Sequence, residues 1–358
     1  MNSNTGGAPL NIGYIPISSS FESPGDSRRF VYYARQRNIF FEIADINKKY
    51  DFVVLTQAAD LSLWCNYTKS PIIFDFIDSY YALPRGNIKN LLRGLAKFLS
   101  GQSKYLQLSY WKTLEKICRI STVIICSTYE QKEMLASFNS NIHVILDIQE
   151  LFSSKPKLDY CASNSIKLVW EGLPQNIHSL KILKNVIGEK IEENKIELHV
   201  ISDLNYHKYL GKYYFVDSAQ EVRKIFPKAI FHEWSKTTLV NIVGSCDLAV
   251  IPIDVNCPLA AGKPENKLIL FWRMGMPVIS SKTKAYERAM SLTGYDFTCK
   301  DEMEWCKKLI LLINSESLRK EVASAGMRVA KDCYSTNKLM TQWDQVISSL
   351  NFTPYSRH

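Results

Sequence analysis

The chain has 358 residues, of which 46% are hydrophobic and 22% charged, and its formal net charge is +9. This composition excludes a disordered chain and suffices for two domains of ordinary size. The sequence contains no apolar run of about eighteen residues and begins with a small, polar stretch, so we expect neither a membrane-spanning helix nor a signal peptide. Nine cysteines without a C-x-x-C pair favour reduced thiols in a cytoplasmic protein over disulfides or a metal framework.

Short apolar runs alternate with helical patterns through the first half of the chain. The runs, which we expect to be buried parallel strands, are residues 11–17, 51–55, 71–77, 122–126 and 142–146. The helical patterns are residues 27–37, 60–67, 88–99, 105–119 and 129–138. This alternation predicts a doubly wound α/β domain over residues 1–150. Residues 151–165 break the pattern and are predicted to form a linker.

Polar residues follow two of these predicted strands. After the first strand, Asp26 is predicted to cap a helix or to act as an acid or base, and Arg28 and Arg29 to bind a phosphate or an acidic acceptor. Asp78 follows the third strand, at the edge where α/β proteins bind ligands. It is therefore a better candidate for a general base than Asp75, which lies within the strand. A structural role in a helix cap or turn explains Asp78 equally well.

Positive charge is concentrated between residues 85 and 119, where eight Lys and Arg residues face one Glu, a net charge of +7. Within the predicted helix 88–99, Lys89, Arg93 and Lys97 recur every four residues along one face. Such a basic amphipathic helix indicates an anionic membrane surface or another anionic partner. Packing of its apolar face on its own domain is the alternative. No nucleic-acid-binding motif accompanies the charge, so we do not expect nucleic acid as a partner.

The strand–helix alternation restarts at residue 166. Strands are predicted at residues 166–170, 196–201, 229–234, 248–253 and 277–280, with a helix at 176–193. These elements predict a second α/β domain over residues 166–334, and residues 302–350 are almost continuously helical in pattern.

Two segments of this second half have the pattern of a phosphate site. Gly172 follows the first strand and Asn176 begins the next helix, an arrangement that lets backbone approach a phosphate. Lys263 and Lys267, with Glu265 and Asn266 between them, lie at the start of a later helix. Its outward-pointing N–H groups and positive dipole suit a phosphate or diphosphate. Ordinary solvated lysines at a helix start are the alternative.

In chain order, Trp170-Glu-Gly172 with Asn176, then Phe231-His-Glu-Trp234, then the segment from Lys263 to Pro277 resemble the donor-binding half of GT-B glycosyltransferases. The resemblance covers residues 166–350 well and the first half only in general order. It implies two Rossmann-like domains facing a cleft, with a C-terminal helix at 335–358 returning to the first domain. It also implies that Glu233 and Trp234 line a nucleobase pocket.

The chain departs from this family at one motif. Many retaining members have two glutamates near the donor, and the matching positions here are Gly262 and Leu270. Glu265, close to the same helix start, is predicted to replace the ribose-binding carboxylate. The missing pair leaves the stereochemical outcome open.

The resemblance implies a transferase that moves a sugar from a nucleotide-diphosphate sugar to a hydroxyl of a glycan or lipid-linked glycan, in bacterial-type surface polysaccharide synthesis. No D-x-D motif is present, so we expect lysines and helix N–H groups, rather than a metal, to stabilise the leaving diphosphate. We expect no cofactor, and a location in the cytoplasm, peripheral on the inner face of the membrane. The alternatives are an inactive GT-B scaffold in a polysaccharide assembly complex, or a nucleotide-sugar epimerase of the same fold.

Overall fold

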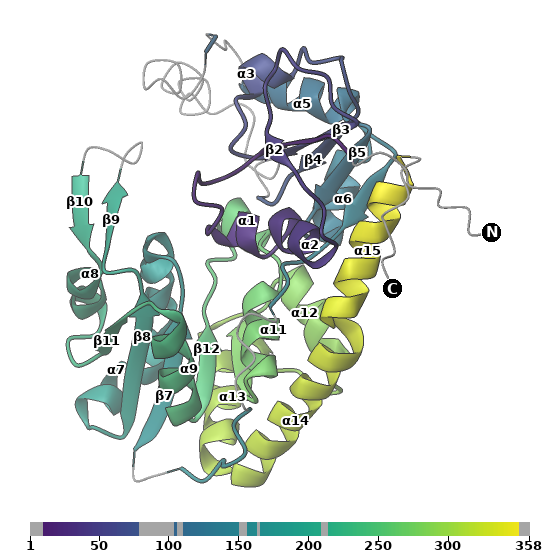
Figure 1. Ribbon diagram of the computed structural model, residues 1–358. Coiled ribbons are helices and arrows are strands. Elements are labelled where there is room, and N and C mark those ends of the chain that lie inside the picture. Colours follow the sequence, from purple (N-terminus) through teal and green to yellow (C-terminus); the bar gives the residue numbers. More distant parts are fainter. Residues whose placement is uncertain are drawn as a thin grey trace. The chain divides into compact units, whose positions relative to one another are not determined.

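The computed structural model describes residues 10–78, 104–105, 110–149, 156–162, 165–208 and 214–350. The chain divides into two compact units: unit 1 is Met1–Ile148 with Asn337–His358, and unit 2 is Gln149–Thr336. Each unit contains a six-stranded parallel sheet with flanking helices (Figure 1). The predicted α/β fold class is therefore confirmed.

The sheet of unit 1 has the strand order β2-β1-β3-β4-β5-β6. Its strands are β1 (Ile12–Ile15), β2 (Glu42–Ile43), β3 (Phe52–Thr56), β4 (Ile72–Asp75), β5 (Val123–Cys126) and β6 (Ile142–Val144). All residues of β3, β4 and β5 are buried, as expected for central strands covered on both faces. The short edge strand β2 is exposed and was not predicted. The strand order reverses between β1 and β3, which is where α/β sheets bind ligands.

The described helices of unit 1 are shorter than the sequence pattern predicts. They are α1 (Pro24–Ser27), α2 (Phe30–Gln36), α3 (Leu61–Trp64), α5 (Tyr110–Ile120), α6 (Tyr129–Leu135) and α15 (Thr336–Ser348), the last counted in unit 1 from Asn337 onward. The single helix predicted over 27–37 is two helices, because the backbone of Arg29 leaves the helical region at φ −129° and ψ −122°. The predicted helix 88–99 lies outside the described residues.

Helix α15 packs on α2 within unit 1. The ring of Trp343 stacks on Tyr33 at 5.6 Å between centroids and also contacts Phe30. Asp344 accepts hydrogen bonds from the Tyr33 hydroxyl and from the guanidinium of Arg37. These contacts join the last described helix of the chain to the first α/β unit.

The sheet of unit 2 has the strand order β11-β8-β7-β12-β13-β14. Its strands are β7 (Ile166–Glu171), β8 (Ile196–Ser202), β11 (Ile230–Glu233), β12 (Leu248–Ile251), β13 (Val278–Ser281) and β14 (Thr298–Cys299). This is the strand order of dinucleotide-binding sheets, with its reversal between β7 and β12. A separate antiparallel hairpin, β9 (Asn205–Lys208) and β10 (Tyr214–Asp217), follows β8 (Figure 1) and was not predicted.

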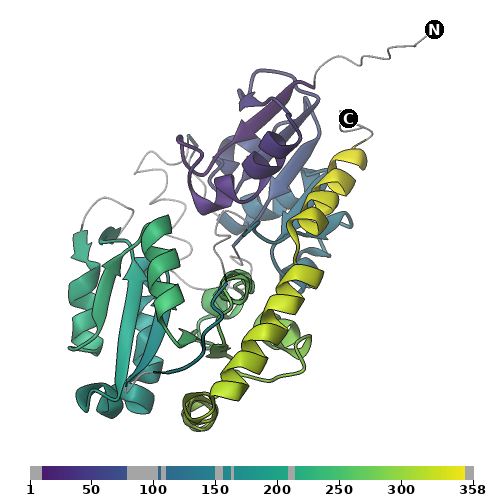
Figure 2. The same cartoon turned by 60° about the horizontal axis from the view of Figure 1, so that its bottom comes forward.

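Helices cover both faces of the unit 2 sheet (Figure 2). They are the 3₁₀ helix η3 (Pro174–Leu183), α7 (Lys184–Glu192), α8 (Ser218–Ile225), α9 (Lys236–Ser245), α10 (Pro258–Ala261), α11 (Asn266–Arg273), α12 (Lys284–Ser291), α13 (Glu302–Asn314) and α14 (Glu316–Cys333). The first half of the helix predicted over 176–193 is therefore 3₁₀ and the second half is α-helical. The sequence pattern did not reveal this, because apolar spacing over a few turns does not separate the two helix types.

Part of the predicted linker is fixed on unit 2. The Tyr160 hydroxyl donates to the carbonyls of Lys157 and Gly275, at 3.0 and 2.9 Å. The buried guanidinium of Arg319 donates to the Tyr160 carbonyl at 2.7 Å and to the Leu312 carbonyl at 2.8 Å. Gly275 has φ +74°, and a Cβ there would lie 2.8 Å from the Lys157 carbonyl oxygen, so both its conformation and its surroundings require glycine.

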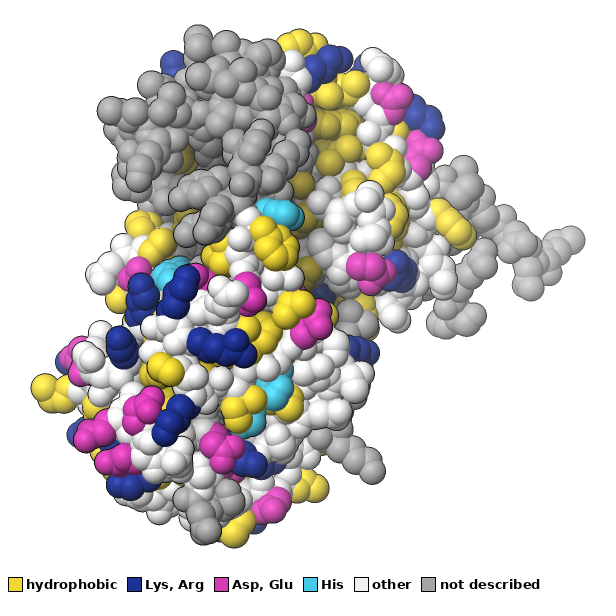
Figure 3. Space-filling view, turned by 90° about the vertical axis from the view of Figure 1, so that its left-hand side faces the viewer, with side chains coloured by type: hydrophobic (Ala, Val, Ile, Leu, Met, Phe, Trp, Pro, Cys, Tyr) yellow, Lys and Arg dark blue, Asp and Glu magenta, His cyan; other side chains and the backbone are white. Residues whose placement is uncertain are grey.

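Charge of both signs is found on the face of the molecule drawn in Figure 3. Figure 3 shows Lys and Arg side chains interspersed with Asp and Glu over the lower part of one face. Among the described residues, no helix combines the length and the apolar character needed to cross a bilayer.

Candidate functional site

The lysines predicted to bind phosphate contact the carboxyl end of β7 and the segment that follows it, beside the strand-order reversal in unit 2. Lys267, in the first turn of α11, donates to the carbonyl of Glu171. Its Nζ lies 3.5 Å from a carboxylate oxygen of Glu171 and 5.2 Å from the ring centroid of Trp170. A carbonyl, a carboxylate and the face of an indole therefore hold this ammonium group at the end of β7.

Gly172 makes room for this lysine. A Cβ on Gly172 would lie 2.5 Å from Lys267 Nζ and 2.7 Å from the ring of Trp170, which is buried. Glycine is thus favoured at this position because two side chains approach it closely. The sequence suggested a different reason, the approach of backbone to a phosphate.

Lys263 reaches the same loop from the other side. Its Nζ donates to Asn176 Oδ1 at 2.6 Å, and both side chains are partly exposed. An ammonium group has three N–H donors, so these contacts are compatible with further hydrogen bonds to phosphate oxygens. Asn266 is the first residue of α11. We refer to Lys263, Lys267, Gly172 and Asn176 as the lysine site of unit 2.

Glu265 lies directly before α11, at the helix start where the sequence placed it. Its side chain is buried, with 4% exposure, and Oε1 accepts a hydrogen bond from the Tyr334 hydroxyl at 3.3 Å. Burial, and then the carboxylate of Glu265, raise the pKa of Tyr334. Because the carboxylate points into the interior beside the start of α11, the structure does not support its predicted contact with a ribose.

Three acidic residues lie at the carboxyl ends of β7, β11 and β8. Glu171 and Glu233 end β7 and β11, and Asp203 follows β8. Burial raises the pKa of Asp203, and the carboxylates of Glu171 and Glu233 act in the same direction. Glu233 is exposed, and Trp234, which donates its backbone N–H to the Ser202 carbonyl at 2.8 Å, is partly exposed. The sequence singled out Glu233 and Trp234 but not Asp203, although its place directly after a predicted strand was visible.

In unit 1, Asp26 organises the loop after β1. Its fully buried carboxylate accepts hydrogen bonds from the Tyr14 hydroxyl, from the backbone N–H groups of Ile17 and Ser18 at 2.8 and 2.9 Å, and from the Ser23 hydroxyl at 2.7 Å. Both carboxylate oxygens are thus occupied. These contacts favour a structural role over the predicted acid or base role, and residue 23 rather than Asp26 precedes the helix as its cap.

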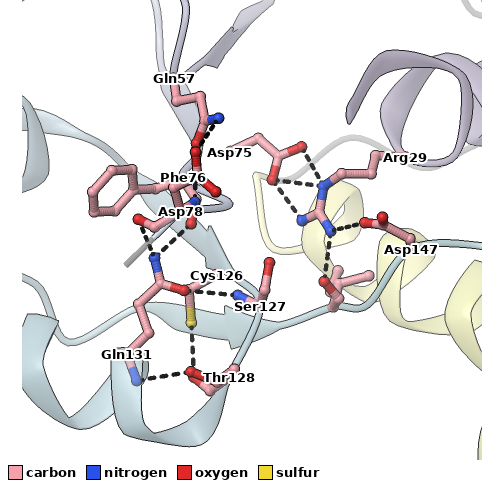
Figure 4. A network of polar contacts seen from close by, with 11 residues as sticks. Arg29, Gln57, Asp75, Phe76, Asp78, Cys126, Ser127, Thr128, Gln131 and Asp147 are labelled. Carbon is pink, nitrogen blue, oxygen red and sulfur yellow. Dashed lines mark hydrogen bonds and ion pairs between the residues drawn. The ribbon is translucent and has the colours of Figure 1, made fainter. Parts of the chain in front are cut away.

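Arg29 is also used inside unit 1 (Figure 4). The guanidinium is fully buried and donates to Asp75 at 2.6 to 3.1 Å, to Asp147 at 3.1 Å and to the Ile145 carbonyl at 2.9 Å. It therefore joins the start of α2 to the ends of β4 and β6. Complete burial does not fit the predicted contact with a phosphate or acceptor. Arg28 is partly exposed, and its carbonyl accepts from the Ile148 N–H at 2.8 Å.

Asp78 is partly exposed at the carboxyl end of β4. Its carboxylate accepts a hydrogen bond at 2.8 Å from Gln57, the residue that follows β3 (Figure 4). This places Asp78 at the edge predicted from the sequence. The predicted membrane-surface residues Lys89, Arg93 and Lys97 lie outside the described part of the chain.

His232 belongs to a histidine pair on the unit 2 sheet. The rings of His199 and His232 stack at 5.2 Å between centroids, with 3.0 Å between Nδ1 of the first and Nε2 of the second. Burial lowers the pKa of both imidazoles. Across the described ranges, no three His, Cys, Asp or Glu side chains are placed to hold a metal ion.

No protein-family model and no curated protein sequence matches this chain. Solved structures do match. HepE from Anabaena, in complex with UDP, is 12% identical over 95% of this chain and 100% of its own, with a TM-score of 0.65. A glycosyltransferase from Rickettsia africae is 11% identical over 96% of this chain and 99% of its own, with a TM-score of 0.60. The chain has the GT-B fold.

This GT-B protein also matches TarM at 12% identity and a TM-score of 0.57, but it spans about half, 55%, of the TarM chain. The resemblance predicted from the motifs is thus confirmed for the fold. Within the fold, the predicted Gly172, Asn176, Lys263 and Lys267 lie together in unit 2. Sequence reasoning missed the glutamine contacts of Asp78, because they join residues far apart in the chain.

Proposed function

We propose that the protein is a glycosyltransferase that moves a sugar from a nucleotide-diphosphate sugar to a hydroxyl of a glycan or lipid-linked glycan. The observation that carries the proposal is the lysine site, where two ammonium groups converge at the strand-order reversal of a dinucleotide-type sheet. Two structures of the same fold agree with it: HepE was solved with UDP-glucose, and pneumococcal GtfA, an O-GlcNAc transferase, with UDP and GlcNAc.

The lysine site matches the charge that develops on the leaving diphosphate. Lys263 and Lys267 supply two positive charges, and the first turn of α11 supplies backbone N–H groups directed outward. Fixed positive groups aimed at developing negative charge lower the transition-state energy without reorganisation. We therefore propose that donor activation rests on these groups and not on a metal ion.

In this proposal Asp78 of unit 1 removes the proton of the acceptor hydroxyl. Oδ2 is held by Gln57, whereas Oδ1 accepts no hydrogen bond from any residue that the structure describes. A general base needs an unoccupied oxygen within hydrogen-bond reach of the hydroxyl. Among the described residues, the partly exposed side chain of Asp78 fits this requirement better than the buried carboxylates of Asp26 and Asp75.

A nucleotide screen followed by turnover tests the proposal. A nucleotide at about 100 times its Kd stabilises the folded protein by about 2.7 kcal/mol, which thermal unfolding detects. Nucleotide sugars of the stabilising base are then assayed with glycan and lipid-linked acceptors. We expect Asp78→Asn to lose kcat and keep nucleotide affinity. Donor binding without turnover on any acceptor would instead favour an inactive scaffold.

We further propose that the protein acts at an anionic membrane surface, as synthesis of surface polysaccharide on a lipid-linked acceptor requires. The support is the net charge of +7 between residues 85 and 119, including the described Lys112, Lys116 and Arg119. Each cation near such a surface contributes about 1 kcal/mol. Flotation with anionic vesicles should therefore retain the wild type and lose a variant with Lys89, Arg93 and Lys97 changed to Glu. Equal, negligible binding of both would exclude this location.

A further inference from the structure

Asp78 is held by a side chain that contacts both its backbone and its carboxylate. Gln57 Nε2 donates to Asp78 Oδ2 at 2.8 Å, and the backbone N–H of Asp78 donates to Gln57 Oε1 at 2.9 Å (Figure 4). Two parallel hydrogen bonds between one amide and one residue fix the direction of the carboxylate. They occupy Oδ2 and leave Oδ1 without a hydrogen bond from any described residue.

A second glutamine fixes the backbone at the same place. Gln131 is fully buried in the first turn of α6. Its Nε2 donates to the carbonyls of Phe76 and Asp78 at 2.7 and 3.2 Å, and its Oε1 accepts from the Ser127 N–H at 3.0 Å. Both N–H donors of the amide are therefore used. Gln131 thus joins the segment after β4 to the segment after β5, which leaves Asp78 on a backbone tied at both strand ends.

The described partner of the Asp78 carboxylate is a neutral amide, whereas the neighbouring carboxylates are paired with a cation. Asp75 and Asp147 are paired with the guanidinium of Arg29, whereas Asp78 forms no ion pair with any described residue. A cation favours the charged form of a carboxylate strongly and so weakens it as a base. A neutral amide donor orients a carboxylate at a smaller cost in basicity. A carboxylate that accepts a proton needs a fixed orientation and an undiminished basicity, and a neutral amide partner provides the first with little loss of the second.

We propose that Gln57 and Gln131 are positioning residues for Asp78: Gln57 directs one carboxylate oxygen away from the protein toward the acceptor hydroxyl, and Gln131 holds the backbone that carries it. This inference rests on the proposed function, since it assigns how the base of that reaction is oriented. It adds two residues that are argued to act through Asp78 and not on the reacting groups.

The first test is Gln57→Glu, which keeps the shape of the side chain and replaces its N–H donor by a carboxylate. A like charge beside Asp78 favours the protonated form. We expect the acid limb of the kcat–pH profile to move up by about one pH unit, so that kcat on that limb falls about tenfold and recovers at high pH. The donor KM should stay within twofold. Gln36→Glu, the same change at an exposed position of α2 in the same unit, should leave the profile unchanged.

A merely structural role for Gln57 predicts a different result. A loss of kcat that is equal at every pH, or no loss at all, would overturn the inference. Gln131→Met, which fills similar space without an amide, should lower kcat at least tenfold with an unchanged donor KM. A folded Gln131→Met protein with wild-type kcat would refute the role of Gln131, and if this variant does not fold, the Gln57 profile decides.

A measurement that needs no turnover distinguishes failure of this inference from failure of the proposed function. The carboxyl carbon of Asp78 is followed by NMR during a pH titration of protein labelled at aspartate, with its resonance assigned by its loss in Asp78→Asn. In Gln57→Glu its midpoint should move to higher pH even if no acceptor is ever found. An unmoved midpoint overturns the inference that Gln57 orients this carboxylate. Full kcat in Asp78→Asn overturns the assignment of Asp78 as base and, with it, the positioning role of the two glutamines in the reaction, while a moved midpoint would still show that Gln57 faces the carboxylate.

Discussion

The two units place charged groups at the carboxyl ends of similar parallel sheets but use them in opposite ways. In unit 1, Arg29 and Asp75 are buried and paired with each other. In unit 2, Lys263 and Lys267 are partly exposed, and several of their contacts are neutral ones to an amide, a carbonyl and an aromatic ring. A charge that is buried and paired stabilises its fold, whereas a charge held at the surface by weak partners is available to a ligand.

The largest expected effect is on the stability of unit 1. Arg29→Ala leaves the carboxylate of Asp75 buried without its cation and removes the partner of the partly exposed Asp147, and removing one partner of a buried ion pair costs about 3–5 kcal/mol. Urea unfolding measures the change. The matched control is Arg37→Ala, which breaks an ion pair with Asp344 that is partly exposed, and should cost about 1 kcal/mol or less. If both variants lose the same unfolding free energy, the buried ion pair of Arg29 stabilises unit 1 no more than the partly exposed pair of Arg37 does.

In unit 2, removal of a charge should instead lower the affinity for the donor and leave the unfolding free energy nearly unchanged. Charge-assisted hydrogen bonds contribute about 1.5–3 kcal/mol. Lys263→Ala and Lys267→Ala should therefore each weaken donor binding about tenfold or more, with little change in unfolding free energy. Isothermal titration with the donor nucleotide measures this. Lys284→Ala, at the exposed start of α12 in the same unit, should bind normally. If both variants bind as tightly as wild type, these lysines are only solvated.

An intermediate effect is expected where packing, not charge, holds the lysine site. Gly172→Ala would force the new Cβ against Lys267 and Trp170, and overpacking of this kind costs about 1–3 kcal/mol. Unfolding free energy and nucleotide affinity should fall together. Gly188→Ala, in the middle of α7 with nothing within 4 Å of the added atom, should instead stabilise by about 0.5–1 kcal/mol. Gly172→Ala protein that binds and unfolds like wild type would show that the lysine can move aside.

The smallest effect is a pH dependence from the histidine pair in unit 2. Burial lowers the pKa of His199 and His232 below the ordinary value of 6.5, with Glu197 opposing the shift at His199 and Lys167 adding to it. The unfolded chain therefore binds protons more readily, so stability is present above about pH 6.5 and falls as the pH drops toward the folded values. Denaturation between pH 7.5 and 5 should show this slope for wild type and a shallower one for His232→Gln. His178→Gln, an exposed position, is the control and should keep the wild-type slope.

Sequence pattern predicted most of the central strands, because buried parallel strands are continuous apolar runs that need no partner to be recognised. It missed β2 and β14, which have two residues each, and the hairpin of β9 and β10, whose pairing lies outside any local period. It also predicted one helix where Arg29 separates two. The local pattern does not show that the backbone leaves the helical region at Arg29, a residue whose buried side chain pairs with Asp75, far along the chain.

The sequence by itself determined the GT-B resemblance and the neighbourhood of Lys263 and Lys267, because glycine, proline and lysine at a strand–helix boundary act through local backbone geometry. Only the tertiary structure decided which charges remain available. Asp26, Arg29 and Glu265 have the residue types and positions of site residues, yet each is buried: Asp26 accepts hydrogen bonds within its own loop, whereas Arg29 and Glu265 contact residues far along the chain. Asp78 is partly exposed and is held by two neutral side chains, Gln57 directly after β3 and Gln131 in the first turn of α6. Burial and pairing depend on the whole fold, and they separate a binding residue from a structural one of the same type.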